Sequence, residues 1–296
     1  MKTTDGKKSK RVVWQDILNP SDKDLAPIVK EFRLHPVIVN ELKGPSARTH
    51  VEALPHYLFF TYFFPVYDAA EGTSTRTEID FIIAEHKVVT VHYDSFAEIF
   101  DGVTAEGAAH SLEATYRILK QLITFEERQL RHIREKVERV GKELFKNNER
   151  KILESINYLK RDISEYRIIV HLQEPILHSL VSAGKNFWGN ETEIYLNDLL
   201  GDQARIASQL EAYREAIADF ESTNTQLMNL KTNSVMRTLT SLSFLTFPSM
   251  VFLALFTTAA RGTPIVDSPH GFWIIASMLA VLIFSLAMYF KKKNWL

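Results

Sequence analysis

The chain contains no cysteine, so it can form neither disulfides nor thiolate metal sites. That absence suits a reducing compartment. The chain also lacks an excess of either charge, because 35 lysines and arginines nearly balance 36 aspartates and glutamates. A chain with this balance has no basic field that would favour nucleic acid as a partner.

Catalytic motifs are missing as well. The sequence has no Gly-rich phosphate loop, no nucleophile elbow and no pair of catalytic carboxylates, so we do not expect an enzyme. The N-terminal segment 1–10 is polar and Lys-rich, and no apolar stretch follows it. It therefore does not fit a secretory signal, and we expect a disordered cytoplasmic tail.

Two long uncharged apolar runs lie near the C-terminus, at 238–260 and 272–290. At about 1.5 Å of rise per helical residue they would be roughly 34 and 28 Å long, enough to cross a hydrocarbon core of about 30 Å. The loop 261–271 joins them, Arg237 precedes the first run, and the basic tail 291–296 follows the second. By the positive-inside rule, the sequence predicts a multi-pass membrane protein with both termini in the cytoplasm.

The segment 11–104 has the pattern of a mixed α/β domain. Runs rich in β-branched and aromatic residues predict strands at 12–18, 57–67, 77–84 and 87–93. Short helices are expected between the first two strands, at 22–33 and 37–43. In the third strand Glu78 and Asp80 alternate with apolar residues, which predicts one face on a core and the other in water.

From 105 onwards the pattern becomes helical. Apolar residues recur at steps of three and four from 112 to 144 and again from 152 to 180, which predicts an antiparallel helical hairpin over 105–190. A third series follows in 191–237, without Pro or Gly between Gly201 and the first apolar run. We expect a stalk helix there that continues into the membrane span.

Two spans alone cannot enclose a water-filled path, but several copies can do so with one helix each. The first span carries more polar side chains, among them Thr240, Ser243 and Thr246. The second has Ser277 and Ser285 as its only serine or threonine residues, as expected of a helix that faces lipid. The first span is therefore the better candidate for lining a pore.

Several segments resemble the CorA family of magnesium transporters. They are 231–237 with Pro248 in the first span, the closing 289–296, and the N-terminal 34–42 and 48–62. The resemblance implies an α+β cytoplasmic domain, a long stalk helix, a two-helix transmembrane hairpin at 238–260 and 272–290, and a funnel-shaped homopentamer. It also implies transport of divalent cations, magnesium first, through a plasma or inner membrane along the electrochemical gradient. The partners would be further copies, lipid and the cations; magnesium would be transported or regulatory, and no cofactor is implied.

The first span departs from that family at its end. The family has a Gly-Met-Asn signature there, usually after Tyr, which forms the selectivity mouth. Counting without gaps from Pro248, this chain has Phe256 followed by Thr257-Thr258-Ala259. Mg²⁺ sheds water reluctantly, so a pore selects it with oxygen ligands around its hydration shell. Threonine hydroxyls have less reach than asparagine amides, so we expect weaker or differently built affinity.

Arg261 follows directly after the predicted mouth, where several copies around an axis would repel a dication. The loop has one acid, Asp267, so its charge sums to zero with neutral histidine, which reduces electrostatic steering. Alternatively, Arg261 contacts lipid headgroups as an interfacial anchor. A divergent member with changed selectivity or lost conduction, acting as a sensor or scaffold, therefore stays open beside the transporter.

The resemblance also implies roles for single residues. Asn233 matches the polar cytoplasmic end of the pore, Met236 and Phe247 match apolar rings that close it, and Met250 lies one turn beyond. Helix packing in a bundle is the alternative for all four.

Magnesium sensing in the family depends on acidic pairs between neighbouring cytoplasmic domains. Asp198 aligns with one such acid and Asp202 follows four residues later, while Asp94 and Asp101 lie past the last strand as candidate partners. Each also fits a solvated surface or capping residue.

Overall fold

The structure is a computed structural model of the chain. It describes residues 11–46, 48–68, 70, 72–95, 97–100, 107–146, 148–257, 265 and 269–293. The chain divides into two compact units, Met1–Glu221 and Ser222–Leu296.

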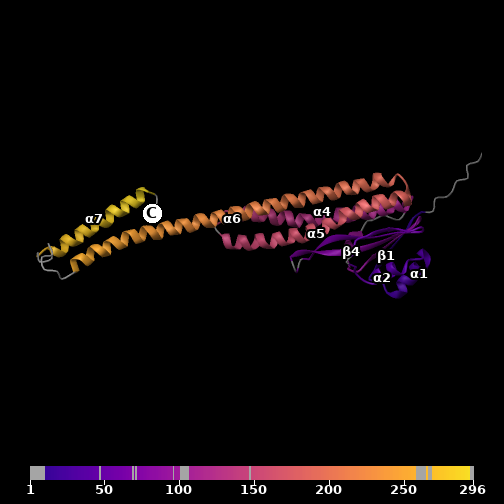
Figure 1. Cartoon of the computed structure of the whole chain (residues 1–296), viewed down its shortest axis with the longest axis horizontal. Coiled ribbons are helices and arrows are strands. Elements are labelled where there is room, and N and C mark those ends of the chain that lie inside the picture. Colours follow the sequence, from indigo (N-terminus) through magenta and orange to yellow (C-terminus); the bar gives the residue numbers. More distant parts are fainter. Residues whose placement is uncertain are drawn as a thin grey trace, which may run out of the picture. The chain divides into compact units, whose positions relative to one another are not determined.

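The first unit is built on a five-stranded sheet with the order β1-β5-β4-β3-β2 (Figure 1). The strands are β1 (Val13–Leu18), β2 (Val51–Ala53), β3 (Leu58–Asp68), β4 (Thr73–Ile83) and β5 (Lys87–His92). β1 pairs with β5 in parallel, and the other neighbours are antiparallel. The four strands expected from the sequence are confirmed, whereas the three-residue β2 was not foreseen.

Two short helices, α1 (Asp22–Phe32) and α2 (Pro36–Glu41), pack on one face of the sheet (Figure 1). α1 begins at Ser21, whose backbone N–H and hydroxyl both donate to Asp24, forming a capping box. α2 starts with Pro36, whose fixed φ suits the first helical position. Together they bury an apolar core against β3, β4 and β5 that includes Leu25, Ile28, Phe32, Ile38, Phe59, Ile82 and Val89. A one-turn helix, α3 (Ala97–Phe100), follows β5.

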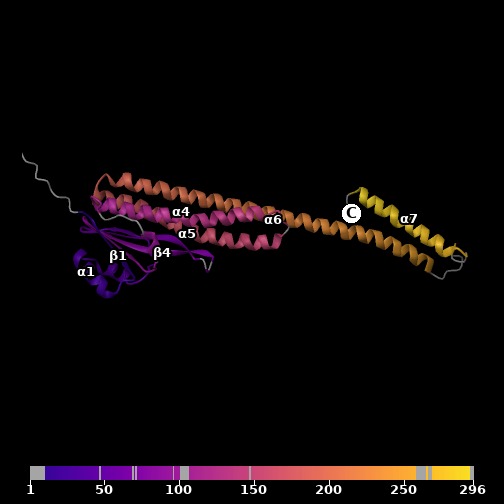
Figure 2. The same cartoon turned by 180° about the vertical axis from the view of Figure 1, so that it is seen from behind.

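The opposite face of the sheet is covered by α4 (Ser111–Glu143) and α5 (Glu149–Trp188) (Figures 1 and 2). The Phe64 ring of β3 meets the Phe125 ring of α4 edge-on at 6.3 Å. The amide of Gln173 in α5 donates to the Phe63 carbonyl at 2.8 Å. The short connection between α4 and α5 makes them the expected antiparallel hairpin.

Helices on both faces overturn the expectation that one face of β4 lies in water. The side chains of Glu78 and Asp80 point to the same face as Ile82, and the two residues are 5% and 1% exposed. Alternation in a strand tells which residues share a face, but it does not tell whether another element covers that face. Here α2 and the chain that follows it cover both acids.

α6 (Thr192–Thr257) is one helix that begins in the first unit and ends in the second, as expected for a stalk that continues into the span. Its first part lies beside α4 and α5 (Figures 1 and 2). Lys120 of α4 contacts Asp198, and Gly141 lies against the ring of Phe220 near the far end of α4. Residues nearer the C-terminus of α4 contact residues nearer the C-terminus of α6, so the two helices run parallel.

The second unit holds the rest of α6 and α7 (Gly271–Lys292). The rings of Phe244 and Phe290 approach to 6.2 Å between the two helices. A groove between them is lined by Phe252, Ser277, Met278, Val281, Leu282 and Ser285. The expected hairpin of apolar helices is therefore present.

Candidate functional site

Both helices of the second unit have apolar surfaces that the chain itself leaves open. α6 and α7 are long and apolar enough to cross a membrane, with mean hydropathies of 1.8 and 2.3 over their most apolar windows. Only 11% and 6% of those windows are buried inside the chain. Exposed apolar surface of this extent needs lipid or further protein copies to cover it.

The predicted pore residues share one side of α6. Met236, Phe247 and Met250 have exposed side chains, and so does Asn233. Steps of three and four bring Met236, Phe247 and Met250 onto one stripe, together with Thr240 and Ser243. We call Met236, Thr240, Ser243, Phe247 and Met250 the α6 stripe.

The α6 stripe points away from α7. Phe252 lines the groove with α7, and Met250 is two positions earlier. At about 100° per residue, two positions turn the helix by roughly 200°, so these side chains lie on nearly opposite sides. Ser241 and Ser249 are buried. Each is two positions from a residue of the α6 stripe, Ser243 and Phe247 respectively, so each lies on nearly the opposite side of the helix. One side of α6 therefore packs in the hairpin, and the α6 stripe is left for other molecules.

Hydroxyl groups in the span donate to backbone carbonyls one turn earlier in the same helix. Ser243 donates to the Leu239 carbonyl at 2.9 Å, and Thr246 donates to the Leu242 carbonyl at 3.0 Å. Each hydroxyl oxygen keeps lone pairs for a second partner. Such a helix can present oxygen acceptors without leaving a polar hydrogen unsatisfied in lipid.

The predicted mouth is only partly described. Phe256 packs against Phe252 at 5.0 Å between ring centroids, and the Thr257 hydroxyl donates to the Ala254 carbonyl at 3.0 Å. α6 ends at Thr257. Thr258, Ala259 and Arg261 lie outside the described residues.

The two predicted regulatory acids of α6, Asp198 and Asp202, lie together, and both pair with the same lysine side chain. Lys120 of α4 donates to Asp198 at 2.7 Å and also to Asp202. The Tyr116 hydroxyl donates to Asp198 at 2.8 Å, and Arg205 donates to Asp202 at 3.2 Å. The hydrogen bonds from Lys120 and then from Tyr116 lower the pKa of Asp198. Both carboxyl groups thus have basic partners within the chain.

The other two predicted acids do not join this group. Asp94 is exposed, and no contact recorded among the described residues links it to Asp198 or Asp202. Asp101 lies outside the described residues. In the part of the chain that the structure describes, no three His, Asp or Glu side chains are arranged to hold a metal ion.

Lys120 was not foreseen from the sequence. It follows Tyr116 by one turn, and a lysine beside the apolar seam of a predicted hairpin is a weak signal. Its partners are 78 and 82 positions away, so only the tertiary structure reveals the pairing.

The sequence matches a known family model and resembles known proteins over nearly its whole length. The family model for the CorA-like Mg2+ transporter protein matches residues 9–292. The cobalt/magnesium transport protein CorA of Methanocaldococcus jannaschii is 20% identical over 304 residues, which cover 97% of this chain and 92% of that protein. The protein of the same name from Thermotoga maritima is 22% identical over 292 residues, covering 96% and 83%.

Solved structures share the fold. The complete CorA magnesium transporter from M. jannaschii superposes with a TM-score of 0.82 at 19% identity, covering 97% of this chain and 92% of that one. The full-length CmaX protein superposes with a TM-score of 0.73 at 16% identity, covering 96% and 89%.

Proposed function

The chain belongs to the family of CorA-like Mg2+ transporter proteins, and we propose that it carries divalent cations, magnesium first, across a membrane through a pore shared by several copies. It is a transporter and not an enzyme. The proposed pore is homopentameric, with one α6 from each copy around its axis.

The α6 stripe is the observation that carries this proposal. It combines the hydroxyls of Thr240 and Ser243 with the large apolar side chains of Met236, Phe247 and Met250. Hydroxyl oxygens can bind the hydration shell of a hard cation. Rings of apolar side chains can close the same path by dewetting. Because the stripe lies opposite the α7 side, copies meeting through it leave α7 on the outside, against lipid.

The driving force comes from the membrane potential and the ion gradient. A charge crossing 100 mV gains about 2.3 kcal/mol, so a dication gains about twice that amount. No coupled reaction is required for uptake into a negative cell interior. We place the protein in the plasma or inner membrane with both termini in the cytoplasm, because Arg237 and Lys291 to Lys293 flank the two spans.

Reconstitution in liposomes that contain a magnesium-sensitive dye tests the proposal. With an inward gradient and a negative interior, we expect magnesium entry well above that of empty liposomes. A relative that carries Gly-Met-Asn provides the positive control. No flux under conditions in which the relative conducts would contradict the proposal.

A second candidate is favoured by the sequence at the mouth. Thr257-Thr258-Ala259 stands where the family has Gly-Met-Asn. A mouth with shorter oxygen ligands would pass other ions or none, and the protein would then act as a membrane-bound sensor or scaffold. Flux of cobalt, nickel, zinc or monovalent ions in the same liposomes, measured with matching dyes, separates changed selectivity from lost conduction.

For regulation, we propose that a divalent cation reaching Asp198 and Asp202 has to compete with Lys120. The ammonium is tethered, so it is present at high local concentration whatever the magnesium level. Regulation by intracellular magnesium at these acids would therefore be weak in the native chain.

A further inference from the structure

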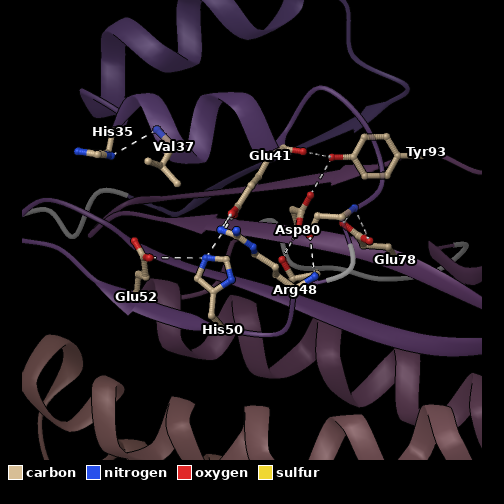
Figure 3. A network of polar contacts seen from close by, with 11 residues as sticks. His35, Val37, Glu41, Arg48, His50, Glu52, Glu78, Asp80 and Tyr93 are labelled. Carbon is tan, nitrogen blue, oxygen red and sulfur yellow. Dashed lines mark hydrogen bonds and ion pairs between the residues drawn. The ribbon is translucent and has the colours of Figure 1, made fainter.

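Three carboxyl groups gather between α2 and the sheet (Figure 3). Glu41 is the last residue of α2, and Glu78 and Asp80 come from β4. The side chains of Asp80 and Tyr93 meet, and the Tyr93 hydroxyl donates to Oδ2 of Asp80 at 2.9 Å and to the Glu41 carbonyl at 3.3 Å. The Thr61 hydroxyl donates to Oδ1 of Asp80 at 2.6 Å. Asp80 is therefore enclosed by hydroxyl partners.

Glu78 holds the backbone of the turn that follows α2. Both of its carboxyl oxygens lie 2.9 Å from the backbone nitrogen of Ser46, which donates to them (Figure 3). Gly44, Pro45 and Ser46 form this turn, which we call the 44–46 turn. The buried Glu78 carboxylate thus joins the turn to the middle of the sheet.

A hollow adjoins the 44–46 turn. It has a volume of about 580 Å³ and is lined by Pro36, Val37, Asn40, Glu41, the three turn residues and Arg48. The turn therefore borders unfilled space as well as Glu78. The hydrogen bonds to Glu78 therefore decide how closely the turn is held.

The remaining charged groups lie at the rim of the cluster. Arg48 and His50 approach the carboxyl group of Glu41 at 3.6 and 3.3 Å, and His50 lies 3.7 Å from Glu52 of β2. Arg76 of β4 attracts Glu78, while its guanidinium lies over the Phe63 ring at 4.8 Å. Arg48 and His50 pair with Glu41, and Arg76 lies over Phe63, so Glu78 and Asp80 have no ion-pair partner within 4.0 Å among the described residues.

Burial makes both acids bind protons readily. It raises the pKa of Glu78 to about 7, with a further contribution from Asp80, against the hydrogen bond from the Ser46 N–H. Burial also raises the pKa of Asp80 to about 6, against the hydrogen bonds from Thr61 and Tyr93, and Glu41 adds repulsion. Two neighbouring carboxyls of this kind titrate as a coupled pair.

We propose that Glu78 is a proton-sensitive latch, which holds the 44–46 turn on the sheet when ionised and releases it when it takes up a proton. The ionised carboxylate accepts the Ser46 N–H in a charge-assisted hydrogen bond, and protonation leaves a neutral bond of roughly half that strength. The same proton removes repulsion between Glu78 and Asp80. Acidification therefore loosens the turn while it stabilises the domain as a whole.

Hydrogen exchange of the full chain in detergent tests the latch, with Glu78→Gln as the mimic of the protonated group. At pH 8 we expect the 44–46 turn to exchange about tenfold faster in the variant than in the native chain. At pH 5.5 the two should converge, because native Glu78 is then protonated. Comparing two proteins at one pH cancels the intrinsic pH dependence of exchange. Glu85→Gln, at a residue 88% exposed just after β4, serves as the matched control and should not differ from the native chain.

A ratio that stays constant from pH 5.5 to 8, or no difference at pH 8, would overturn the proposal. Infrared titration gives a second readout when the spectrum of Glu78→Gln is subtracted from that of the native chain, because the difference removes the protonated carboxyls of Asp80 and Glu126. Carboxyl absorption in this difference should persist up to about pH 7, where the pKa of Glu78 lies. Loss of all such absorption by pH 5 would also contradict the latch. Neither measurement requires ion flux, so the latch and the proposed transport fail or succeed separately.

Discussion

The Nζ of Lys120 lies 2.7 Å from Oδ2 of Asp198, 78 residues further along the chain. The contact joins α4 to α6 at the acids for which the sequence predicted a regulatory cation. Lys120 also donates to Asp202. The ammonium group of Lys120 thus lies between these two acids in the isolated subunit.

We expect Lys120→Gln to create a magnesium response. Without the ammonium, Asp198 loses its only ion-pair partner among the described residues and Asp202 keeps only Arg205, so a dication can bind between the two acids. At magnesium tenfold above its Kd, the variant should gain about 1.4 kcal/mol of stability, measured as a rise in Tm. The native chain should gain much less.

Lys160→Gln is the matched control for that prediction. Lys160 pairs with Glu221 of α6 at 2.9 Å, so the variant loses the same charge beside one acid instead of two. Equal magnesium shifts in the two variants would show that Lys120 does not occupy a cation site.

Phe247→Ser should raise cation flux. Phe247 belongs to the α6 stripe and is 70% exposed. If apolar side chains close the pore by dewetting, a hydroxyl lowers the barrier, and removal of about 1.4 kcal/mol gives about tenfold more flux. Phe284→Ser on α7, at a residue 71% exposed, is the control. Liposome flux that rises equally in both variants would contradict a pore-facing Phe247.

Restoring the family signature tests the mouth. We expect the triple variant Thr257→Gly, Thr258→Met and Ala259→Asn to raise magnesium flux over that of the native chain, because longer amide ligands contact the hydration shell better. The readout is magnesium entry into dye-loaded liposomes at one protein density. An unchanged rate in a folded oligomer would show that the mouth does not limit transport.

Lys136→Met should destabilise the first unit. Lys136 donates to Asp162 at 2.7 Å, and the Asp162 side chain is only 1% exposed. Removing the lysine leaves a buried carboxylate without its counterion, which costs about 3 kcal/mol. Arg150→Met breaks an exposed pair with Glu154 and should cost roughly 0.5 kcal/mol or less. Chemical unfolding followed by circular dichroism measures both, and equal losses would contradict the prediction.

Glu126→Gln should be tolerated near neutral pH and should remove part of the pH dependence of stability. Glu126 is fully buried, and burial raises its pKa well above the ordinary 4.5, against a hydrogen bond from Gln173. The folded chain then binds a proton that the unfolded chain releases, so stability falls as pH rises above about 4.5. Tm measured from pH 5 to 8 should fall less in the variant. Parallel curves would show that Glu126 does not titrate on unfolding.

The helices and strands that could be predicted are those with a clear pattern of residue types along the sequence. A run of aromatic and β-branched residues specifies β3, and apolar steps of three and four specify the long helices, whereas β2 has three residues, too few for either pattern. Glu78 and Asp80 were assigned to water because they alternate with apolar residues. Their burial depends on α2, which the alternation does not report.

Sequence by itself determined the longer helices and strands, the two spans and the residues that share a side of α6, because helical and strand patterns are local properties of the chain. Tertiary structure alone decided that the α6 stripe points away from α7, that Lys120 neutralises Asp198, and that Glu78 holds Ser46. These relationships join residues far apart in the chain. Their energies depend on distance and burial in space, which no local pattern of residues encodes.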